Sequence, residues 1–502
     1  MRKIILLSIG ILCLQFSTTA QTISDALRFS QTYVEGTART LAVGGSLNAL
    51  GADFSVISSN PAGLAAYRSS EFVFTPGIVS SNTDGTLTGG NNLTVTTNRN
   101  NFALHNAGVV VTSTPSYSKW KTFNFAFGIN RVASFGDKFA FNGRSRGSIT
   151  DRFVELADGL EPDELDDFEA GLAYETGAIY DSNGDLLYNS DFFTNPDHTV
   201  YKEQEVATSG GITELALSLG GNLDDKLYMG VTFAIPFISY TEERLYRELD
   251  NDQDEIPFFN ALGYQENINY TGAGFQAKFG FIYRAAQALR LGFSFHTPTF
   301  YKLTDQYNSF MTYDFTDPSS GRERYESASP DGFFEYRVRT PWRVNGSMGF
   351  LIGRLGFLHL DVEWQDYRTA RFDFITPSFA DAAYERQLNN SIENNYKSAF
   401  NIRTGGEIAI NPFRIRAGVA FLGSPFAEDD NFTNEYSAGF GIREKGFYID
   451  MGYRLQLREE GYVPYFTANS DFDGDGIGDA PQQFVETERV RHQFIMTIGL
   501  KF

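Results

Sequence analysis

Cysteine is nearly missing from this chain of 502 residues, and the single one, Cys13, lies close to the N-terminus. Residues 1–20 have the features of a secretory signal peptide: Arg2 and Lys3 come first, an apolar run follows, and small residues precede Gln21. We expect this segment to be removed, which leaves a mature chain without cysteine. Disulfides, thiolate metal sites and cysteine nucleophiles are then excluded.

Long hydrophobic runs are also missing. After residue 20 no stretch reaches the roughly 18 apolar residues of a membrane helix. An exported chain of this kind is either soluble or a membrane β-barrel, because only helices and closed barrels satisfy their backbone groups in lipid. Basic residues are scarce too: 41 Lys and Arg stand against 62 Asp and Glu, a formal net charge of −21. Such a chain is a poor nucleic-acid binder, since contacts to phosphates need clustered basic side chains.

Aromatic residues, by contrast, are abundant, with 47 Phe and 26 Tyr. After residue 70 the sequence alternates with period two, as in 123–130 (FNFAFGIN), where one face is large and apolar and the other is small or polar. A soluble β-sandwich would alternate in the same way. The apolar faces, however, have the length of membrane-crossing strands, and the last strand ends in the aromatic Phe502, which resembles the recognition signal of outer-membrane barrels. We therefore predict a transmembrane barrel over residues 70–502, in the outer membrane of a Gram-negative cell.

Fourteen strands are predicted, an even number as is usual for bacterial barrels. Short turns join some of them, and long loops, which we expect to be extracellular, join the others. The predicted long loops are 134–210, 244–265, 302–333, 375–392 and 461–487. The predicted strands are 70–82, 101–113, 121–133, 211–221, 225–243, 266–284, 288–301, 334–353, 355–374, 393–410, 413–424, 434–445, 447–460 and 488–502.

Residues 21–69 do not follow this pattern. The stretch 41–67 is rich in Gly, Ala and Ser, nearly uncharged, and without a sustained hydrophobic period, and Pro61 predicts a turn after Asn60. We interpret residues 21–69 as a plug inside the barrel. A surface loop with a common turn is the alternative that these residues alone leave open.

A family resemblance supports the plug. Asp53, followed by Asn60, Pro61, Ala62 and Gly63 ahead of the first strand, resembles the FadL-like family of outer-membrane transporters for hydrophobic molecules. The resemblance implies a 14-stranded barrel whose lumen is closed by a hatch containing the Asn-Pro-Ala segment. It also implies passive uptake of long-chain fatty acids or other hydrophobic compounds, gated by movement of the hatch.

The loop 134–210 contains the one credible helical stretch, from Asp151 to about Gly171, interrupted at Pro162. In the family the corresponding loop forms helices over the barrel mouth, beside a hydrophobic site. The same residues also fit a solvated acidic cap without a ligand. The apolar candidates for ligand capture recur at spacings of three to five: Phe153, Leu156, Leu160, Leu165 and Phe168.

An Asp-rich stretch near the C-terminus, 471–479, has the spacing of a calcium-binding loop. Gln482 stands where a bidentate Glu is expected, so we predict a weak, structural Ca²⁺ site, with a bare acidic turn as the alternative. The chain requires no other cofactor. The expected ligands are Asp471, Asp473, Asp475 and Asp479, with the carbonyl of Ile477.

His359, Asp361 and Glu363 alternate on one face of a predicted strand. A base with two carboxylates could serve an outer-membrane hydrolase, but we interpret the three as part of a polar network with the many Arg residues of the lumen, and expect no enzyme. The predicted function is therefore an uptake channel whose partners are membrane lipid and a hydrophobic small molecule. The alternative is a non-transporting barrel subunit of a secretion or assembly complex that binds proteins through its long loops.

Overall fold

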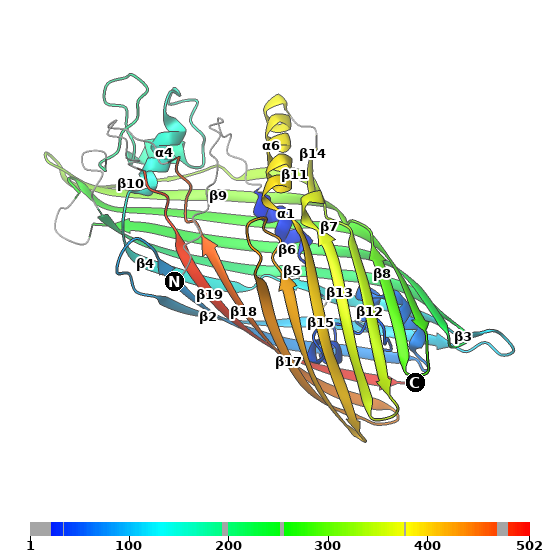
Figure 1. Cartoon of the computed structure of the whole chain (residues 1–502). Helices are drawn as coiled ribbons and strands as arrows, with labels where there is room; N and C mark the ends of the chain where they lie inside the picture. The colour runs from blue at the N-terminus through cyan, green and yellow to red at the C-terminus, as the bar shows by residue number, and fades with distance from the viewer. Residues whose placement is uncertain (1–21, 34, 193–198, 251–255, 376–377, 469–479) are drawn as a thin grey trace.

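The strands form one closed antiparallel sheet (Figure 1). The computed structural model describes residues 22–33, 35–192, 199–250, 256–375, 378–468 and 480–502. The first strand pairs with the second and also with the last, which closes the barrel. The strands are β1 (Glu71–Leu87), β2 (Val95–Ser113), β3 (Trp120–Ser134), β4 (Asp137–Arg146), β5 (Thr199–Leu223), β6 (Leu227–Leu249), β7 (Phe259–Arg284), β8 (Leu289–His296), β9 (Phe300–Asp317), β10 (Gly321–Ala328), β11 (Gly332–Arg339), β12 (Arg343–Ile352), β13 (Gly356–Asp366), β14 (Arg371–Phe374), β15 (Ser398–Ile410), β16 (Phe413–Gly423), β17 (Phe432–Arg443), β18 (Phe447–Tyr462) and β19 (Val485–Lys501).

Several of these elements are pieces of one wall strand. Both β3 and β4 pair with β5, and both β8 and β9 pair with β7. In the next wall strand, β10 and β11 pair with β9, and β12 pairs with β8. In the wall strand after that, β13 pairs with β12, and β14 pairs with β11. Pro298 and Pro341 lie at two of the interruptions, where a residue without an N–H cannot continue the ladder. Joined in this way, the pieces make the 14 wall strands that the sequence predicted.

The outer face carries a belt of apolar side chains near the end with the short turns. On β6, Phe233, Ile235 and Phe237 point outward and are 42–48% exposed, whereas Thr241 and Glu243 occupy the outward positions farther along the strand. Exposed aromatic and aliphatic side chains in such a band are what a lipid-facing surface requires. The strands β5 to β7 are 23 to 26 residues long, so they continue well beyond the belt on the long-loop side.

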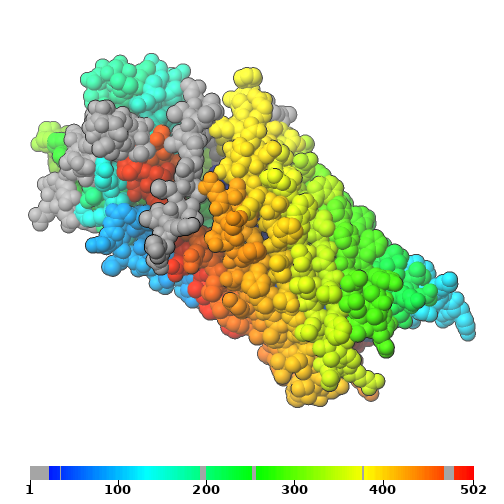
Figure 2. All heavy atoms as spheres, viewed as in Figure 1, coloured from blue at the N-terminus to red at the C-terminus, as the bar shows by residue number. Residues whose placement is uncertain are grey.

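The helices lie inside the barrel or over its long-loop end (Figure 1). Within the residues that the structure describes, no helix is both long and apolar enough to cross a membrane. Four of the helices belong to 22–69 and lie in the lumen (Figure 1). Helix α6 stands above the rim of the barrel (Figure 2). The helices are α1 (Ile23–Ser30), α2 (Ala38–Ala42), α3 (Val56–Ser59), η1 (Pro61–Ala66), α4 (Ile149–Ala157), α5 (Ala170–Thr176), η2 (Tyr367–Thr369) and α6 (Phe379–Asn395).

The connections at the long-loop end are shorter than the sequence predicted. The prediction of a loop over 302–333 was wrong, because β9 and β10 form a long hairpin through it. The loops are shorter at both ends than the predicted 134–210 and 244–265, because β4 and β5 extend into the first and β6 and β7 into the second. The predicted loop 375–392 contains most of α6. The predicted loop 461–487 is shorter by a few residues at each end, where β18 and β19 extend into it.

Candidate functional site

The predicted gate residues Asn60 and Pro61 lie in the lumen and contact the wall near the short-turn end. The Asn60 side chain is fully buried; its Nδ2 donates to the Asn48 carbonyl at 2.7 Å and its Oδ1 accepts from the Ala62 amide at 3.2 Å, which caps η1. Pro61 occupies the first helical position, where a missing N–H has no cost. These bonds fix the turn that the sequence predicted.

Glycines in the wall receive the plug, which we define as residues 22–69. A Cβ placed on Gly280 would lie 2.0 Å from Asn60 Oδ1, and one on Gly230 would lie 2.2 Å from the Pro61 carbonyl oxygen. The plug therefore touches the strand backbone itself, an approach that only glycine permits. Wall glycines at which a Cβ would come within 3 Å of plug atoms are Gly108, Gly128, Gly220, Gly230, Gly280, Gly292, Gly349, Gly405, Gly418, Gly439 and Gly452.

Asp53, also predicted as a gate residue, holds the plug together. Its carboxylate accepts hydrogen bonds from the hydroxyls of Thr37 at 2.8 Å and Thr40 at 2.9 Å, and from the Ser55 amide at 3.0 Å. The side chain is 5% exposed, so these bonds replace water. Asp53 thus joins the chain around α2 to the start of α3.

Ala62 and Gly63 complete the predicted segment and are both buried. Gly63 packs directly on Gly51, where an added Cβ would lie 2.7 Å from the Gly63 Cα, and the Gly63 carbonyl accepts from the Ala52 amide at 3.0 Å. Gly51 also has φ +69°, a left-handed conformation that favours glycine. The close contact brings 51–52 beside 62–63 within the plug.

The plug is bonded to both the last and the early strands of the wall. The amide of Ala38, in α2, donates to Thr497 Oγ1 of β19 at 2.7 Å. On another side of the lumen, Thr122 Oγ1 of β3 donates to the Ala65 carbonyl of η1 at 2.9 Å. As a result, α2 is attached to late strands and η1 to early ones.

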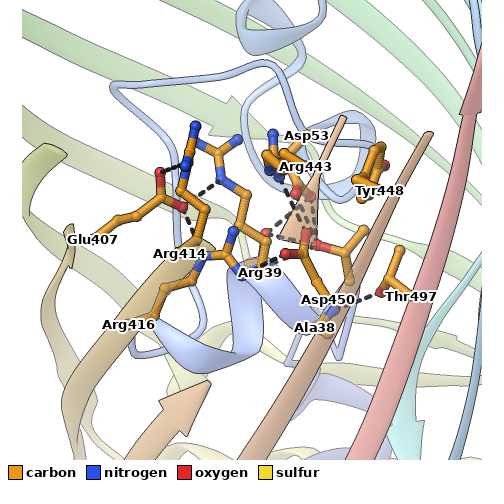
Figure 3. Close-up of polar contacts among 12 residues, drawn as sticks. Ala38, Arg39, Asp53, Glu407, Arg414, Arg416, Arg443, Tyr448, Asp450 and Thr497 are labelled. Atoms are coloured by element: carbon orange, nitrogen blue, oxygen red, sulfur yellow. Dashed lines mark hydrogen bonds and ion pairs between the residues drawn. The ribbon is translucent and has the colours of Figure 1, made fainter. Parts of the chain in front are cut away.

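A charged network surrounds α2 near the short-turn end (Figure 3). Arg416 donates to Glu407 at 2.6 Å and to Asp450 at 2.7 Å, and Arg443 donates to Asp450 at 3.1 Å. Arg39 of the plug reaches the same Glu407 at 3.5 Å. Arg416 and Asp450 are almost fully buried, and their pairing leaves neither charge without an opposite charge beside it. Arg39 joins the plug to this network.

A small polar cavity of about 30 Å³ lies between the plug and the wall. Its lining includes Arg343, Glu363, Arg403, Glu435 and Arg454. A cavity of this size takes little more than water, and its charged walls do not suit an apolar molecule. This cavity therefore offers no room for an organic molecule.

A larger apolar region lies nearer the long-loop end, around α1. Ala26, Leu27 and Phe29 are buried there, and the Phe29 ring packs edge-on against Tyr270 with centroids 5.9 Å apart. We call this region the α1 chamber. Its buried wall and α6 side chains are Val132, Ala133, Ile212, Ile238, Tyr240, Tyr270, Tyr301, Leu303, Tyr336, Val338, Tyr367, Ala370, Phe372, Phe374, Leu388, Ile392, Tyr396 and Ala399.

The predicted capture residues lie in the cap, which we define as residues 147–192. Phe153 and Leu165 are buried in a second apolar cluster, with Leu156 and Leu160 packed against it, and Phe153 contacts Tyr264 with ring centroids 5.6 Å apart. Phe168 instead contacts Tyr307, at 4.8 Å. The structure thus brings the first four together in the interior of the cap, while Phe168 packs against the wall strand β9.

The predicted helix over 151–171 is only partly present: α4 covers its first residues and α5 begins at Ala170, while the segment between them, around Pro162, is not helical. Asp151 accepts from the Ser148 amide at 2.8 Å at the start of α4. Burial raises the pKa of Asp151 to about 7, and the nearby Glu248 carboxylate adds to the rise against the lowering effect of the Ser148 bond. The Asp151 carboxyl group therefore titrates near neutral pH in the cap.

His359 and its neighbours belong to the contact between plug and wall. The His359 ring is buried, with Nδ1 3.0 Å from Asp361 Oδ2 and Nε2 2.6 Å from the carbonyl oxygen of Val43 in the plug. Glu363 lies 3.4 Å from Arg403. The arrangement is the polar network that the sequence suggested.

The Asp-rich stretch falls outside the described residues, so Asp471, Asp473, Asp475, Ile477 and Asp479 stay a predicted calcium site. In the part of the chain that the structure describes, no three carboxylate, His or Cys side chains are grouped as a metal would need.

Two features of the lumen were missed from the sequence. One is α1, although Thr22 and Asp25 form a capping box whose spacing was readable at its start. The other is the pair of inward-facing tyrosines Tyr240 and Tyr270, directly opposite each other on β6 and β7. Their alternation was visible, but which face of a strand is inside cannot be read from period two alone.

Comparisons with known proteins agree on the fold. No family model and no curated protein sequence matches the chain. Among solved structures, a FadL homologue of Pseudomonas aeruginosa is 14% identical with a TM-score of 0.51, the match covering 94% of this chain and 98% of that one. The Pseudomonas putida toluene transporter TodX is 11% identical with a TM-score of 0.52, covering 93% and 99%. The fold implied by the resemblance to FadL-like channels is thus confirmed.

Proposed function

We propose that the protein is an outer-membrane channel for the passive uptake of hydrophobic small molecules, closed by its plug. The observation that carries the proposal is the α1 chamber, an apolar and aromatic region inside a closed barrel. A barrel interior exposed only to water would be polar. Burying an apolar surface of this kind in the lumen, between α1 of the plug and the wall, suits a cargo that leaves water for an apolar site.

The two solved structures point the same way. One is described as a FadL homologue and the other as a toluene transporter. Their descriptions support hydrophobic cargo in general, while the long-chain fatty acids implied by the resemblance are one class within it. The capture step is assigned to the cap, whose apolar interior lies next to the upper lumen.

Passage must involve movement of the plug. The cavity beside it, at about 30 Å³, has no room for an organic molecule, and the Asn60–Gly63 segment lies against the backbone of β6 and β7. We propose that cargo passes when this segment leaves the glycines of the wall. Gating is then a docking equilibrium between plug and barrel.

A plug locked to the wall tests this proposal. A Cβ on Gly349 would lie 3.4 Å from the Cβ of Ala49, close to the spacing in a disulfide. The double variant Ala49→Cys/Gly349→Cys should therefore form a bond between plug and β12, with only the end of the Leu50 side chain moving aside. We expect oxidation to stop the uptake of labelled toluene or oleate by cells that express the variant, and reduction to restore it.

The two single-cysteine variants are the matched controls and should transport under both conditions. Uptake by the oxidised double variant at the level of the controls would contradict plug gating.

Native mass spectrometry of the wild-type protein, extracted in mild detergent, distinguishes the channel from the alternative function as a subunit of a protein complex. A bound hydrophobic molecule supports the channel, whereas a stoichiometric protein partner with no small ligand would favour the barrel subunit of a larger complex.

A further inference from the structure

Arg28 of α1 lies in an aromatic cage inside the α1 chamber. Its guanidinium carbon is 4.1 Å from the centre of the Tyr240 ring and 6.0 Å from that of Tyr270. The two rings are nearly parallel, with an angle of 14° and centroids 5.6 Å apart. Ring faces attract cations, and most strongly where water is excluded. Both tyrosines are almost fully buried.

Two carboxylates lie close to the cage. Glu242 accepts from the Tyr240 hydroxyl and lies 3.7 Å from Arg28 Nη2, so the tyrosine and the acid form one unit. Asp305 is fully buried and lies directly opposite Tyr270 on the neighbouring strand. The cage thus combines ring faces with negative charge, which is how proteins recognise organic ammonium groups.

The wall of the chamber carries an excess of negative charge once α1 is set aside. Glu242, Glu266 and Asp305 lie on the wall strands beside the cage, against Arg244, which pairs with both glutamates. At the end of α1, Arg343 of the wall donates to the Ser30 carbonyl and pairs with Glu363. These four carboxylates and two guanidinium groups give a formal balance of −2. The plug supplies Arg28 to this site together with Asp25, its partner within α1.

We propose that the α1 chamber binds organic cations with a hydrophobic body, and that α1 occupies the site as an internal substitute for such a molecule. Leu27 and Phe29 fill the apolar part, and Arg28 fills the cage. The inference rests on the proposed channel function and specifies its cargo: an alkyl or aryl amine or a quaternary ammonium compound displaces α1, while a carboxylate of the same size is repelled by the wall.

The cap is consistent with this selectivity. The stretch 151–171 carries nine acids and one Arg, and Arg152 is already paired with both oxygens of Glu169. A negative mouth raises the local concentration of cations and lowers that of anions. Capture and binding therefore favour the same charge.

A matched ligand series tests the inference. Octyltrimethylammonium, octanol and octanoate share an alkyl chain and differ in charge, and binding of each to the full-length protein in nanodiscs is measured by calorimetry. Cation–π and ion-pair contacts of this kind predict that the ammonium compound binds about tenfold more tightly than octanol. Octanoate should bind more weakly than octanol.

Three variants assign the effect to the cage. Glu242→Gln should weaken ammonium binding about tenfold and leave octanol unchanged, while Glu243→Gln, on the outward face of the same strand, should change neither. Arg28→Met keeps the alkyl stem and removes the internal cation, so it should tighten ammonium binding alone. An equal change for octanol in that variant would show that α1 had merely loosened, and would overturn the inference.

The outcomes for the inference and for the channel function differ. If octanol binds and the ammonium compound binds no better than octanoate, the charge selectivity is wrong and the hydrophobic channel stands. If none of the three ligands binds, the proposed function fails and the inference falls with it.

Discussion

Gly230→Ala should loosen the plug without disturbing the barrel. A Cβ at this position would lie 2.2 Å from the Pro61 carbonyl oxygen and 2.6 Å from the Ala62 amide nitrogen. Both are backbone atoms, so rotation of a side chain cannot relieve the clash. Since ordinary contacts begin at about 3.4 Å, η1 must retreat from β6 by about 1 Å.

The cost follows from the packing. Inserting one methyl group into a tight contact destabilises by about 1–3 kcal/mol. The strand is folded whether the plug is docked or not, so the lower backbone entropy that alanine loses on folding does not enter the docking equilibrium. The whole loss, about 1–3 kcal/mol, falls on the contact between plug and wall and raises the undocked population about 5- to 150-fold.

Hydrogen exchange of residues 56–66, followed by mass spectrometry, measures this population, and uptake of labelled cargo should rise with it. Gly346→Ala is the matched control, because a Cβ there meets nothing within 4 Å and the residue lies in the wall strand β12. If exchange and uptake in Gly230→Ala equal those in Gly346→Ala, the glycine contact does not hold the plug. The docking argument would then be refuted.

Three further predictions concern the plug and the cap. Asn60→Ala removes the η1 cap and the bond to the Asn48 carbonyl, which should cost the docked plug about 1 kcal/mol of stability. Hydrogen exchange of residues 56–66 should therefore become faster. Asp53→Ala leaves buried hydroxyls unpaired and should cost about 2–3 kcal/mol of plug stability, visible as proteolysis within 37–55 while the barrel stays folded. Because the pKa of Asp151 is raised from 3.8 to about 7, its protonated form is favoured in the folded cap; cap stability should be highest below pH 4 and fall as the pH rises through 7. Exchange of α4 amides, corrected for intrinsic rates, should show this fall, and Asp151→Asn should abolish it.

Period-two alternation located a part of every wall strand, because one face of each must be apolar in lipid. It failed where neither face meets lipid. The segment 321–328 (GRERYESA), which forms β10, is polar on both faces, and so a loop was predicted there. Similarly, α6 buries only Leu388 and Ile392 along its 17 residues, too few to give a helical period.

The plug could be predicted in part. Pro61 predicted a turn after Asn60, where the structure has the Asn60 cap and the start of the short helix η1. What the sequence could not supply is the partner of each plug residue. Gly230 and Gly280 are spaced like ordinary strand glycines, and only the tertiary pairing of β6 with β7 brings them to the same place.

The attachment of the plug to both early and late strands bears on how the barrel assembles. The bond from Ala38 to Thr497 joins residues 459 apart in sequence, and the seam between β1 and β19 is equally long-range. Contacts so distant in sequence form late, because the entropy of closing the intervening chain must be overcome first. We therefore expect residues 22–69 to enter the lumen before the seam shuts, with η1 already packed on β3 to β7 and α2 not yet bonded to the last strands. The plug would then act as a scaffold for closure, and weakening it should slow assembly of the barrel.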